Sequence, residues 1–356
     1  MPRVGLAVVV GLARVASLGG VSRHQELSDD VVAWMSAWDP AVRWQVERDL
    51  LGDPPSVWEV TRARTATEGF GARLLAHQDD DGQWAGGAYF PAADTDGEVV
   101  IDAEGDPDAA GAQPWTATTW SLTFLREWGV PAAALGDTAD RLAVSSRWEY
   151  DDLPYWGGEV DCCINAFTLA NGAWLGTDVD ELADWFPAHQ LADGGWNCEW
   201  VEGSTRSSFH STLNVVRGLL AHELLTGSTA LRASRLRGQE YLLQRHLLHR
   251  ASTGELVGPW VTRIAHPFLW VATALGQLDH LRTASLHDGA APDPRAAEAV
   301  ARVRAARRPD GTWLQERRDP GAVWFHTDVP AGEPSPWLTL IGTRVLDWWD
   351  AGTREA

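Results

Sequence analysis

The chain has 356 residues, of which 45% are apolar, and this composition favours a folded chain with a large core over a disordered one. Its net charge is −20 and all 29 basic residues are arginines, which excludes the basic surface that nucleic acids and anionic membranes require. The lack of lysine also excludes Schiff-base catalysis and a phosphate-binding P-loop lysine.

Residues 1–25 are predicted to be a leader outside the fold. The apolar run after Met1 is similar to the start of a signal peptide, but Arg14 interrupts it and no small-residue cleavage site follows before the acidic segment 26–30. Residues 26–356 show no compositional break and are expected to form one domain. No stretch of about 20 apolar residues occurs, so no membrane span is predicted.

Helical patterns follow in chain order from residue 30, while strand signals are nearly absent, so we predict an all-α fold. Asp39-Pro40 is an N-cap followed by proline at the first helical position, which opens a helix over 41–51. Further along the chain, shorter helices alternate with longer apolar ones. The shorter helices are predicted over 71–77, 179–189 and 294–307, and the longer ones over 116–128, 209–225, 267–281 and 337–349.

A turn with the pattern Asp-Gly-x-Trp recurs between the shorter and the longer helices, at 81–84, 193–196 and 310–313, with looser versions at 156–158 and 254–260. In such a turn the aspartate closes the backbone, the glycine adopts a positive φ and the tryptophan folds back onto the helix ends. The repeat predicts helical hairpins arranged in a ring. The acidic segment 85–114 is predicted to be an inserted surface loop, with a lid over a central cavity as the alternative.

These turns resemble the repeats of squalene–hopene cyclases and of prenyltransferase β subunits, and the resemblance covers residues 30–349. It implies an (α/α)6-like toroid with a central active-site cavity. A second motif resembles the catalytic zinc site of the prenyltransferase β subunits, in which an Asp-x-Cys begins one inner helix and a histidine after an aromatic residue begins the next. The resemblance implies that Asp161, Cys163 and His210 are zinc ligands.

Two departures separate the chain from these families. The basic residues that hold diphosphate before the Asp-x-Cys are replaced by Gly157-Gly158-Glu159-Val160. The Asp-x-Asp-Asp acid of the cyclases has no counterpart at a cavity position, since the acidic strings 79–81 and 178–181 fall in a loop and at the start of an outer helix. Prenyl-diphosphate binding and proton-initiated cyclisation are therefore both disfavoured.

The residue types between 161 and 210 suit zinc, because all three cysteines of the chain fall there. The predicted metal ligands are Asp161, Cys163, Cys198 and His210, with Cys162 as an alternative thiol. The competing interpretations are that Cys162 is a small buried apolar residue, that Asp161 caps the following helix, and that His210 packs without a metal. Three cysteines cannot form a disulfide framework, so metal-binding thiols in a reducing, cytoplasmic compartment are favoured.

An aromatic cavity is expected beside the metal. Arg263 and His266 are the candidate catalytic residues, with Arg263 placed for an anionic group and His266 as an acid or base. The alternative is that the aromatic side chains clamp turns and fill the core, while His266 caps a helix. The predicted pocket residues are Trp115, Trp120, Tyr155, Trp156, Arg206, Trp260, Trp270, Trp324 and Trp337.

The sequence thus predicts a zinc-dependent transferase or cyclase, in which zinc activates a thiol or water nucleophile and the partner is a small apolar substrate such as an isoprenoid. Two alternatives stay open: a metal-independent terpene cyclase, and a non-catalytic binding or scaffold protein with a structural zinc. The metal content of the protein distinguishes a metal-independent cyclase from a zinc enzyme. An open coordination position on the zinc distinguishes a zinc enzyme from a scaffold protein with a structural zinc.

Overall fold

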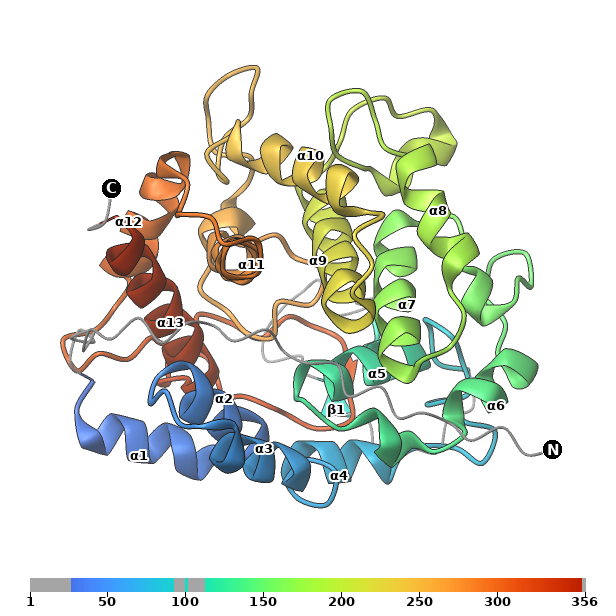
Figure 1. The fold of residues 1–356 in the computed structure, drawn as a ribbon, viewed down its shortest axis with the longest axis horizontal. Coiled ribbons are helices and arrows are strands. Elements are labelled where there is room, and N and C mark those ends of the chain that lie inside the picture. Colours follow the sequence, from blue (N-terminus) through green and yellow to red (C-terminus); the bar gives the residue numbers. More distant parts are fainter. Residues whose placement is uncertain (1–26, 93–99, 102–112, 354–356) are drawn as a thin grey trace.

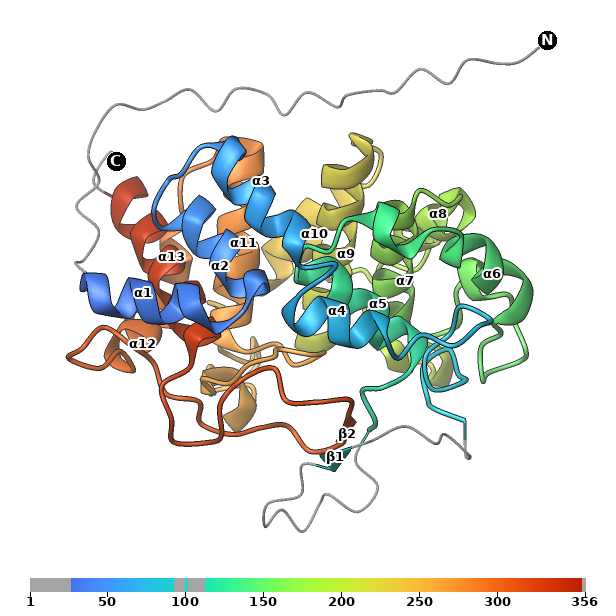
Figure 2. The ribbon, with the colours of Figure 1, turned by 90° about the horizontal axis from the view of Figure 1, so that it is seen from below.

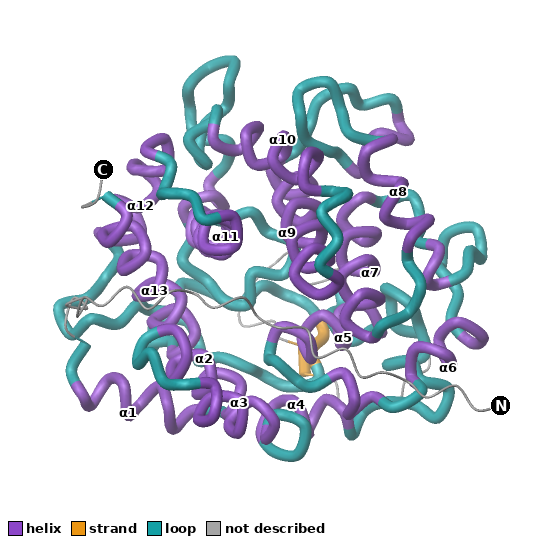
Figure 3. Tube along the Cα trace, in the orientation of Figure 1, coloured by secondary structure: helices purple, strands orange, loops and turns teal. Residues whose placement is uncertain are grey.

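The computed structural model describes residues 27–92, 100–101 and 113–353. The predicted leader at 1–25 lies outside the described residues, as does most of the predicted inserted loop at 85–114. Within the described ranges, helices make up nearly all of the regular structure, and the only strands are two residues long each (Figure 1, Figure 3). The prediction of an all-α fold is therefore confirmed.

The α-helices of the described chain are α1 Asp29–Trp38, α2 Pro40–Asp49, α3 Pro55–Arg64, α4 Gly69–Leu75, α5 Thr118–Glu127, α6 Thr138–Ser145, α7 Cys162–Leu175, α8 Asp180–Ala188, α9 Phe209–Thr226, α10 Arg232–Leu243, α11 Ala274–Asp288, α12 Ala297–Ala305 and α13 Pro336–Gly352. Short 3-10 helices lie between them: η2 Ala132–Leu135, η3 Tyr155–Gly157, η4 Cys198–Glu202, η5 Pro259–Thr262 and η6 Pro294–Ala296. The strands are β1 Val100–Ile101 and β2 Ala322–Val323.

Longer and shorter helices alternate in space as well as in sequence. Figure 1 shows α5, α7, α9, α11 and α13 toward the middle of the molecule, with α6, α8, α10 and α12 around them. Successive central helices contact one another, and α13 returns to contact α1 and α2. The six-hairpin toroid that the family resemblance implies stays a prediction.

The return of α13 to the first helices is held by a buried ionic contact. Arg344 on α13 donates hydrogen bonds to Asp49 at 3.0 Å and Gln45 at 2.9 Å, both on α2, and to Asp279 on α11 at 2.7 Å. The Arg344 side chain is only 10% exposed. Arg344 thus joins α13 to both α2 and α11, and its removal would take a buried cation away from Asp49 and Asp279.

The three strong Asp-Gly-x-Trp turns share one hydrogen-bond pattern. Each indole N–H donates to the backbone carbonyl ten residues earlier: Trp84 to Leu74 at 2.8 Å, Trp196 to Phe186 at 3.0 Å and Trp313 to Val303 at 2.9 Å. These carbonyls belong to the last turns of α4, α8 and α12, where no intrahelical donor follows. The tryptophan indole therefore supplies a hydrogen-bond donor to a carbonyl in the last turn of the shorter helix, in agreement with the predicted folding of the tryptophan onto the helix end.

The same tryptophans also attach the turn to the longer helix that follows. Their backbone N–H groups donate to a threonine hydroxyl in that helix: Thr118 at 3.1 Å, Thr212 at 3.1 Å and Thr339 at 3.3 Å. The turn glycines 82, 194 and 311 have φ values of 92°, 97° and 89°, in the region that favours glycine. One tryptophan thus joins a shorter helix, a turn and a longer helix into one repeated unit.

The looser versions of the turn do not follow this pattern. The indole of Trp156 donates to Ala139, seventeen residues earlier, at 3.0 Å. Trp260 is half-buried, and its ring lies against His210 with the centroids 4.0 Å apart. Their resemblance to the strong turns is therefore one of sequence and not of hydrogen bonding.

The helix predicted over 267–281 is placed too early. It begins at Ala274 and continues to Asp288, because the Thr273 hydroxyl accepts the backbone N–H of Gly276 at 3.1 Å and caps it. The preceding segment, 259–273, is irregular after η5. Arg263, His266 and Trp270 therefore lie in this segment and not at the start of a helix.

Part of the predicted insertion lies against the segment that precedes α13. Strand β1 pairs with β2 in antiparallel orientation, with Val100 opposite Val323, and both lie to one side of the helices (Figure 2). The Trp115 backbone N–H donates to Ala322 at 2.8 Å, and the Trp324 indole donates to Thr116 at 2.9 Å.

Of the helices in the described ranges, none combines the length and hydropathy needed to cross a membrane.

Candidate metal centre and adjoining cavity

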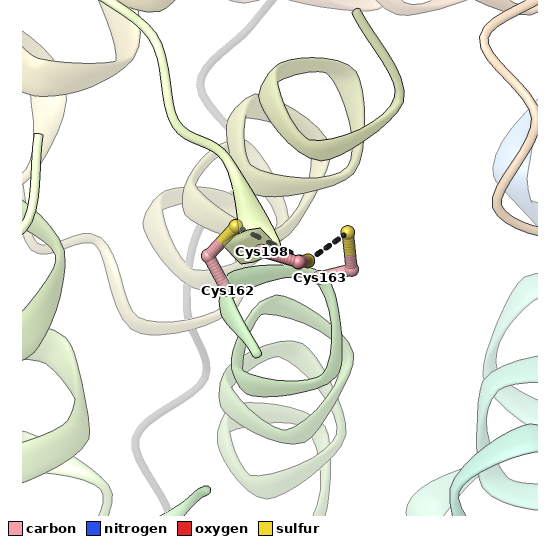
Figure 4. Close-up of side chains that lie close together, drawn as sticks. All are labelled: Cys162, Cys163 and Cys198. Atoms are coloured by element: carbon pink, nitrogen blue, oxygen red, sulfur yellow. Dashed lines mark hydrogen bonds between the residues drawn. The ribbon is translucent and has the colours of Figure 1, made fainter. Parts of the chain in front are cut away.

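The three cysteines converge at the start of α7. Cys162 and Cys163 are its first two residues, and Cys198 begins η4, two residues after the Trp196 turn. The Cys198 sulfur lies 3.1 Å from the sulfur of Cys163 and 3.5 Å from that of Cys162 (Figure 4). All three sulfurs lie within 4.8 Å of one another. The predicted pairing of Cys163 with Cys198 is therefore present, and Cys162 joins it.

Local hydrogen bonds bring η4 to the helix end. The Cys198 backbone N–H donates to the Ser211 hydroxyl of α9 at 3.2 Å. The Trp200 indole donates to the carbonyl of Val160, just before α7, at 2.7 Å. Together with the clamp at Trp196, these contacts place Cys198 over the N-terminus of α7. The helix macrodipole favours negative charge at that position, including a thiolate.

The sulfur atoms share their protons unequally. Hydrogen bonds from the thiols of Cys162 and Cys163, and one from the Ser211 hydroxyl, lower the pKa of Cys198. Burial, together with its hydrogen bonds to the neighbouring sulfurs, raises the pKa of Cys162.

Two carboxylates lie beside the thiols. Burial, followed by the charges of Cys198 and Glu159, raises the pKa of Asp161 to about 7. Burial likewise raises the pKa of Glu159. Asp161 occupies the N-cap position of α7, but its side chain makes no capping hydrogen bond, so the capping role is not observed. In the described part of the chain, no arginine forms an ion pair with either carboxylate.

This donor set fits zinc. Zn–S bonds of about 2.3 Å in a tetrahedron separate the sulfurs by roughly 3.8 Å, close to the distances between these thiols. Thiolate ligands favour zinc, copper(I) and iron–sulfur clusters over magnesium, calcium and manganese. Cys162, Cys163 and Cys198 would hold the ion, and Asp161, whose carboxyl interacts with Cys198, is a candidate for the fourth ligand.

His210 lies at the edge of this cluster with one ring nitrogen engaged. The backbone N–H of Ala272 donates to His210 Nδ1 at 3.0 Å, which leaves the ring proton on Nε2 in the neutral form. Burial lowers the pKa of His210 to about 4, so the neutral form prevails. Neither His210 nor Asp161 belongs to the group of ligand atoms within 4.8 Å. Ligation through Nε2 would require His210 to give up the Ala272 hydrogen bond.

A cavity lies between the ends of α4 and α5, the residues just before α5, and the segments before α11 and α13. Of the predicted residues, Trp115, Trp324 and His266 line it. Its volume of about 60 Å³ has room for on the order of five water molecules. Predicted Arg263 lies behind the lining, where it forms an ion pair with the cavity residue Asp319 at 3.3 Å. An anion-binding role for Arg263 would have to compete with this pair.

Several other predicted pocket residues lie in the core. Trp120 is almost fully buried and contacts Trp115 at a centroid distance of 4.8 Å. Tyr155 is buried with its hydroxyl 3.0 Å from that of Thr119, and Trp156 is buried beside it. These positions agree with the alternative interpretation that the aromatic side chains fill the core.

The remaining predicted pocket residues surround the two histidines or face solvent. Trp260 and Trp270 flank His210, with ring centroids 4.0 and 4.9 Å away. Trp337 stacks on His266 at 4.8 Å, and Arg206 is exposed in the loop before α9. These aromatic residues thus hold the histidines in place.

Sequence reasoning missed Tyr89. Its ring lies 5.3 Å from that of Trp120, and burial, followed by the charges of Cys163, Cys198 and Asp161, raises its pKa. Tyr89 therefore lies near enough to the thiols for their charge to act on its hydroxyl, while its ring contacts Trp120. It falls in the segment interpreted as an insertion, where no periodic pattern marks a buried residue.

Asp328 was missed as well. Its side chain is 3% exposed and lies 3.4 Å from His266 Nδ1. It belongs to the irregular segment before α13, where the sequence predicts only Trp324 as a pocket residue. Comparisons of the chain with models of known protein families and with curated protein sequences give no match. The family resemblance therefore depends on the motifs alone.

Proposed function

We propose that the chain is a zinc-dependent enzyme that transfers or cyclises a small apolar substrate. The observation that carries the proposal is the convergence of three thiols on the N-terminus of α7, beside two carboxylates that have no arginine partner among the described residues. A buried group of acidic side chains without a compensating charge either stays protonated or takes up a cation, and thiolates together with carboxylates are ligands that zinc accepts.

Zinc bound there would supply Lewis acidity and stabilise a bound thiolate or hydroxide as a nucleophile. The chain's own residues would provide the surroundings. Tyr89 contacts Trp120, which in turn contacts the cavity residue Trp115, and these aromatic rings would offer an apolar surface near the metal. An apolar substrate held near this surface would meet the nucleophile in a site of low dielectric constant.

A structural zinc is the second candidate, and Asp161 favours it. With Asp161 as the fourth ligand, three thiolates and one carboxylate would close the coordination shell, as in structural zinc sites. In an enzyme, Asp161 would leave the fourth position to solvent or substrate. The two candidates therefore differ in whether an external ligand reaches the metal.

Metal analysis followed by cobalt substitution tests both candidates. We expect one zinc per chain in the purified protein. We also expect the absorption spectrum of the cobalt form to change when a small thiol such as 2-mercaptoethanol is added, because the thiol enters the open position. A protein without zinc contradicts the proposal altogether. A tetrahedral cobalt spectrum that the thiol does not alter establishes the structural role instead.

A further inference from the structure

His266 and Asp328 form a pair in the wall of the cavity. Both residues line it, and His266 Nδ1 lies 3.4 Å from the Asp328 carboxylate. The side chains are 11% and 3% exposed, respectively. The contact is at ion-pair distance but not in hydrogen-bond alignment, so Nδ1 has no hydrogen-bond partner. Catalytic pairs are often loose in this way before a ligand is bound.

Neighbouring groups hold both members of the pair. Asp328 accepts hydrogen bonds from the Val329 backbone N–H at 2.8 Å and the Ser335 hydroxyl at 2.6 Å. The His266 backbone N–H donates to the Gln315 side chain at 2.9 Å. The His266 ring stacks on Trp337, with an interplanar angle of 22°. The carboxylate and the ring are therefore both fixed in orientation.

This arrangement decides which ring nitrogen of His266 can act. Because Nδ1 faces the Asp328 carboxylate, the proton of the neutral ring is favoured on Nδ1. The other nitrogen, Nε2, then carries the lone pair. Within the described ranges no hydrogen bond engages Nε2, and the ring lines the cavity.

The rest of the lining determines what the cavity would hold. Most of it is apolar and aromatic, contributed by Leu74, Trp115, Phe124, Trp128, Trp324 and Phe325. The other ionisable lining residues are Arg318, Asp319 and His326. A flat apolar group with a single polar substituent matches such a lining.

We propose that His266 is a proton acceptor for an apolar ligand bearing an acidic hydroxyl, such as a phenol, and that Asp328 is its positioning residue. The ligand O–H bond breaks, the proton passes to His266 Nε2 and the electron pair stays on the ligand oxygen. The carboxylate of Asp328 then stabilises the imidazolium. Nothing in this step requires a metal, so it stands apart from the proposed zinc chemistry.

The probe for this step is 4-nitrophenol, whose anion is coloured. At a pH below the pKa of the free phenol, we expect the unmodified protein to generate the phenolate absorption band on binding. The variant His266→Gln should lose the band. The control is His249→Gln. It removes another histidine whose ring pairs with a carboxylate, 2.8 Å from Glu298 on the surface, and this variant should keep the phenolate band.

The role of Asp328 is tested by nitrogen NMR of the His266 ring. We expect the Nδ1–H tautomer in the unmodified protein and a shift toward Nε2–H in Asp328→Asn, with a weaker phenolate band. The tautomer of His266 is measured in the unmodified protein, so this measurement tests the proposal even if His266→Gln does not fold. Absence of the band in the unmodified protein, its persistence in His266→Gln, or a native Nε2–H tautomer would each overturn the proposal. A Cys198→Ser protein without zinc that keeps the band shows that the two proposals fail or succeed separately.

Discussion

Two places in the described part of the chain bring three potential metal ligands within 4.8 Å of one another, and they differ in how charge is balanced. One is the thiol cluster, Cys162, Cys163 and Cys198, at the start of α7. The other is the acidic cluster, Glu223, His287 and Asp288, formed by α9 and α11 near the last turns of both helices. By distance alone, the two are equivalent candidates.

The acidic cluster already contains its cations. Arg235 is fully buried and donates to Glu223 at 3.1 Å and to Asp288 at 2.8 Å, while Arg232 also donates to Glu223. Burial by itself would raise the pKa of Glu223, but hydrogen bonds from Arg232 and His287 and the charge of Arg235 hold it below its usual value. The carboxylates are therefore neutralised without a metal.

The thiol cluster has no such partner among the described residues, and its thiols donate to one another instead. Proximity of ligand atoms therefore does not distinguish the two clusters, whereas charge balance does. The stronger criterion is a buried set of acidic groups whose charge nothing in the protein balances. The predictions below test this distinction, beginning with the largest effect.

Cys198→Ser should abolish stoichiometric zinc binding, because Cys198 contacts both other thiols and a hydroxyl is a poor zinc ligand. The matched change in the acidic cluster is Asp288→Asn, which should leave the zinc content at one per chain. Both are measured by metal analysis after dialysis. If Asp288→Asn loses zinc and Cys198→Ser keeps it, the assignment of the two clusters is reversed.

Arg235→Met should lower the free energy of unfolding by about 3–5 kcal/mol, since it leaves Glu223 and Asp288 without their buried partner. Chemical denaturation measures the change. A suitable control is Arg302→Met, because Arg302 pairs with Glu298 on the surface of α12, with both side chains more than 40% exposed. That change should alter the stability by about 0.5 kcal/mol or less. Equal effects of the two variants would contradict the ion-pair account of the acidic cluster.

Acidification should destabilise the region of the acidic cluster through His280. Burial, followed by the charges of Arg217 and Arg235, lowers the pKa of this α11 residue to about 3. The unfolded chain binds a proton below about pH 6.5, whereas the folded one does not. The free energy of unfolding is therefore independent of this group above about pH 6.5. It falls as the pH decreases from 6.5 toward 3, by up to about 1.4 kcal/mol per pH unit.

The measurement for His280 is the unfolding free energy as a function of pH, in the unmodified protein and in His280→Gln. The variant should show a shallower decline between pH 6.5 and 4. His280 accepts a hydrogen bond from Gln239 at 2.9 Å, and glutamine can preserve a polar contact there. Parallel pH profiles for the two proteins would show that the ring of His280 is not held neutral.

The sequence was sufficient to predict features that depend on local chemistry. The strong Trp turns could be predicted because one Asp-Gly-x-Trp pattern specifies a glycine with positive φ and an indole that reaches back to a helix end. The convergence of Cys163 and Cys198 could be predicted because a helix start and the end of such a turn recur at fixed places in each repeat. These inferences required only the order of elements along the chain.

Contacts that depend on how irregular segments cross could not be predicted. Cys162 joins the thiols because Cys198 lies over the helix end between the first two residues (Figure 4). The sequence predicts Cys162 only as an alternative thiol ligand, with a small buried apolar residue as the competing interpretation. The hydrogen bond from Ala272 to His210 depends on where the segment before α11 passes. The pairing of Asp328 with His266 likewise joins two segments that have no repeating pattern.

The smallest predicted effect separates the stability of a turn from its role at the thiol cluster. Trp196→Phe and Trp313→Phe each leave a carbonyl in the last turn of a shorter helix without its donor, and each should lower the free energy of unfolding by about 1–2 kcal/mol. Only Trp196 lies two residues from a thiol, so only Trp196→Phe should also weaken zinc binding. Urea denaturation measures the first quantity, and competition with a chromophoric chelator measures the second. Because the two tryptophans make the same hydrogen bonds, a loss of zinc affinity in Trp313→Phe as well would mean that general loosening of the fold, and not the placement of Cys198, controls the metal.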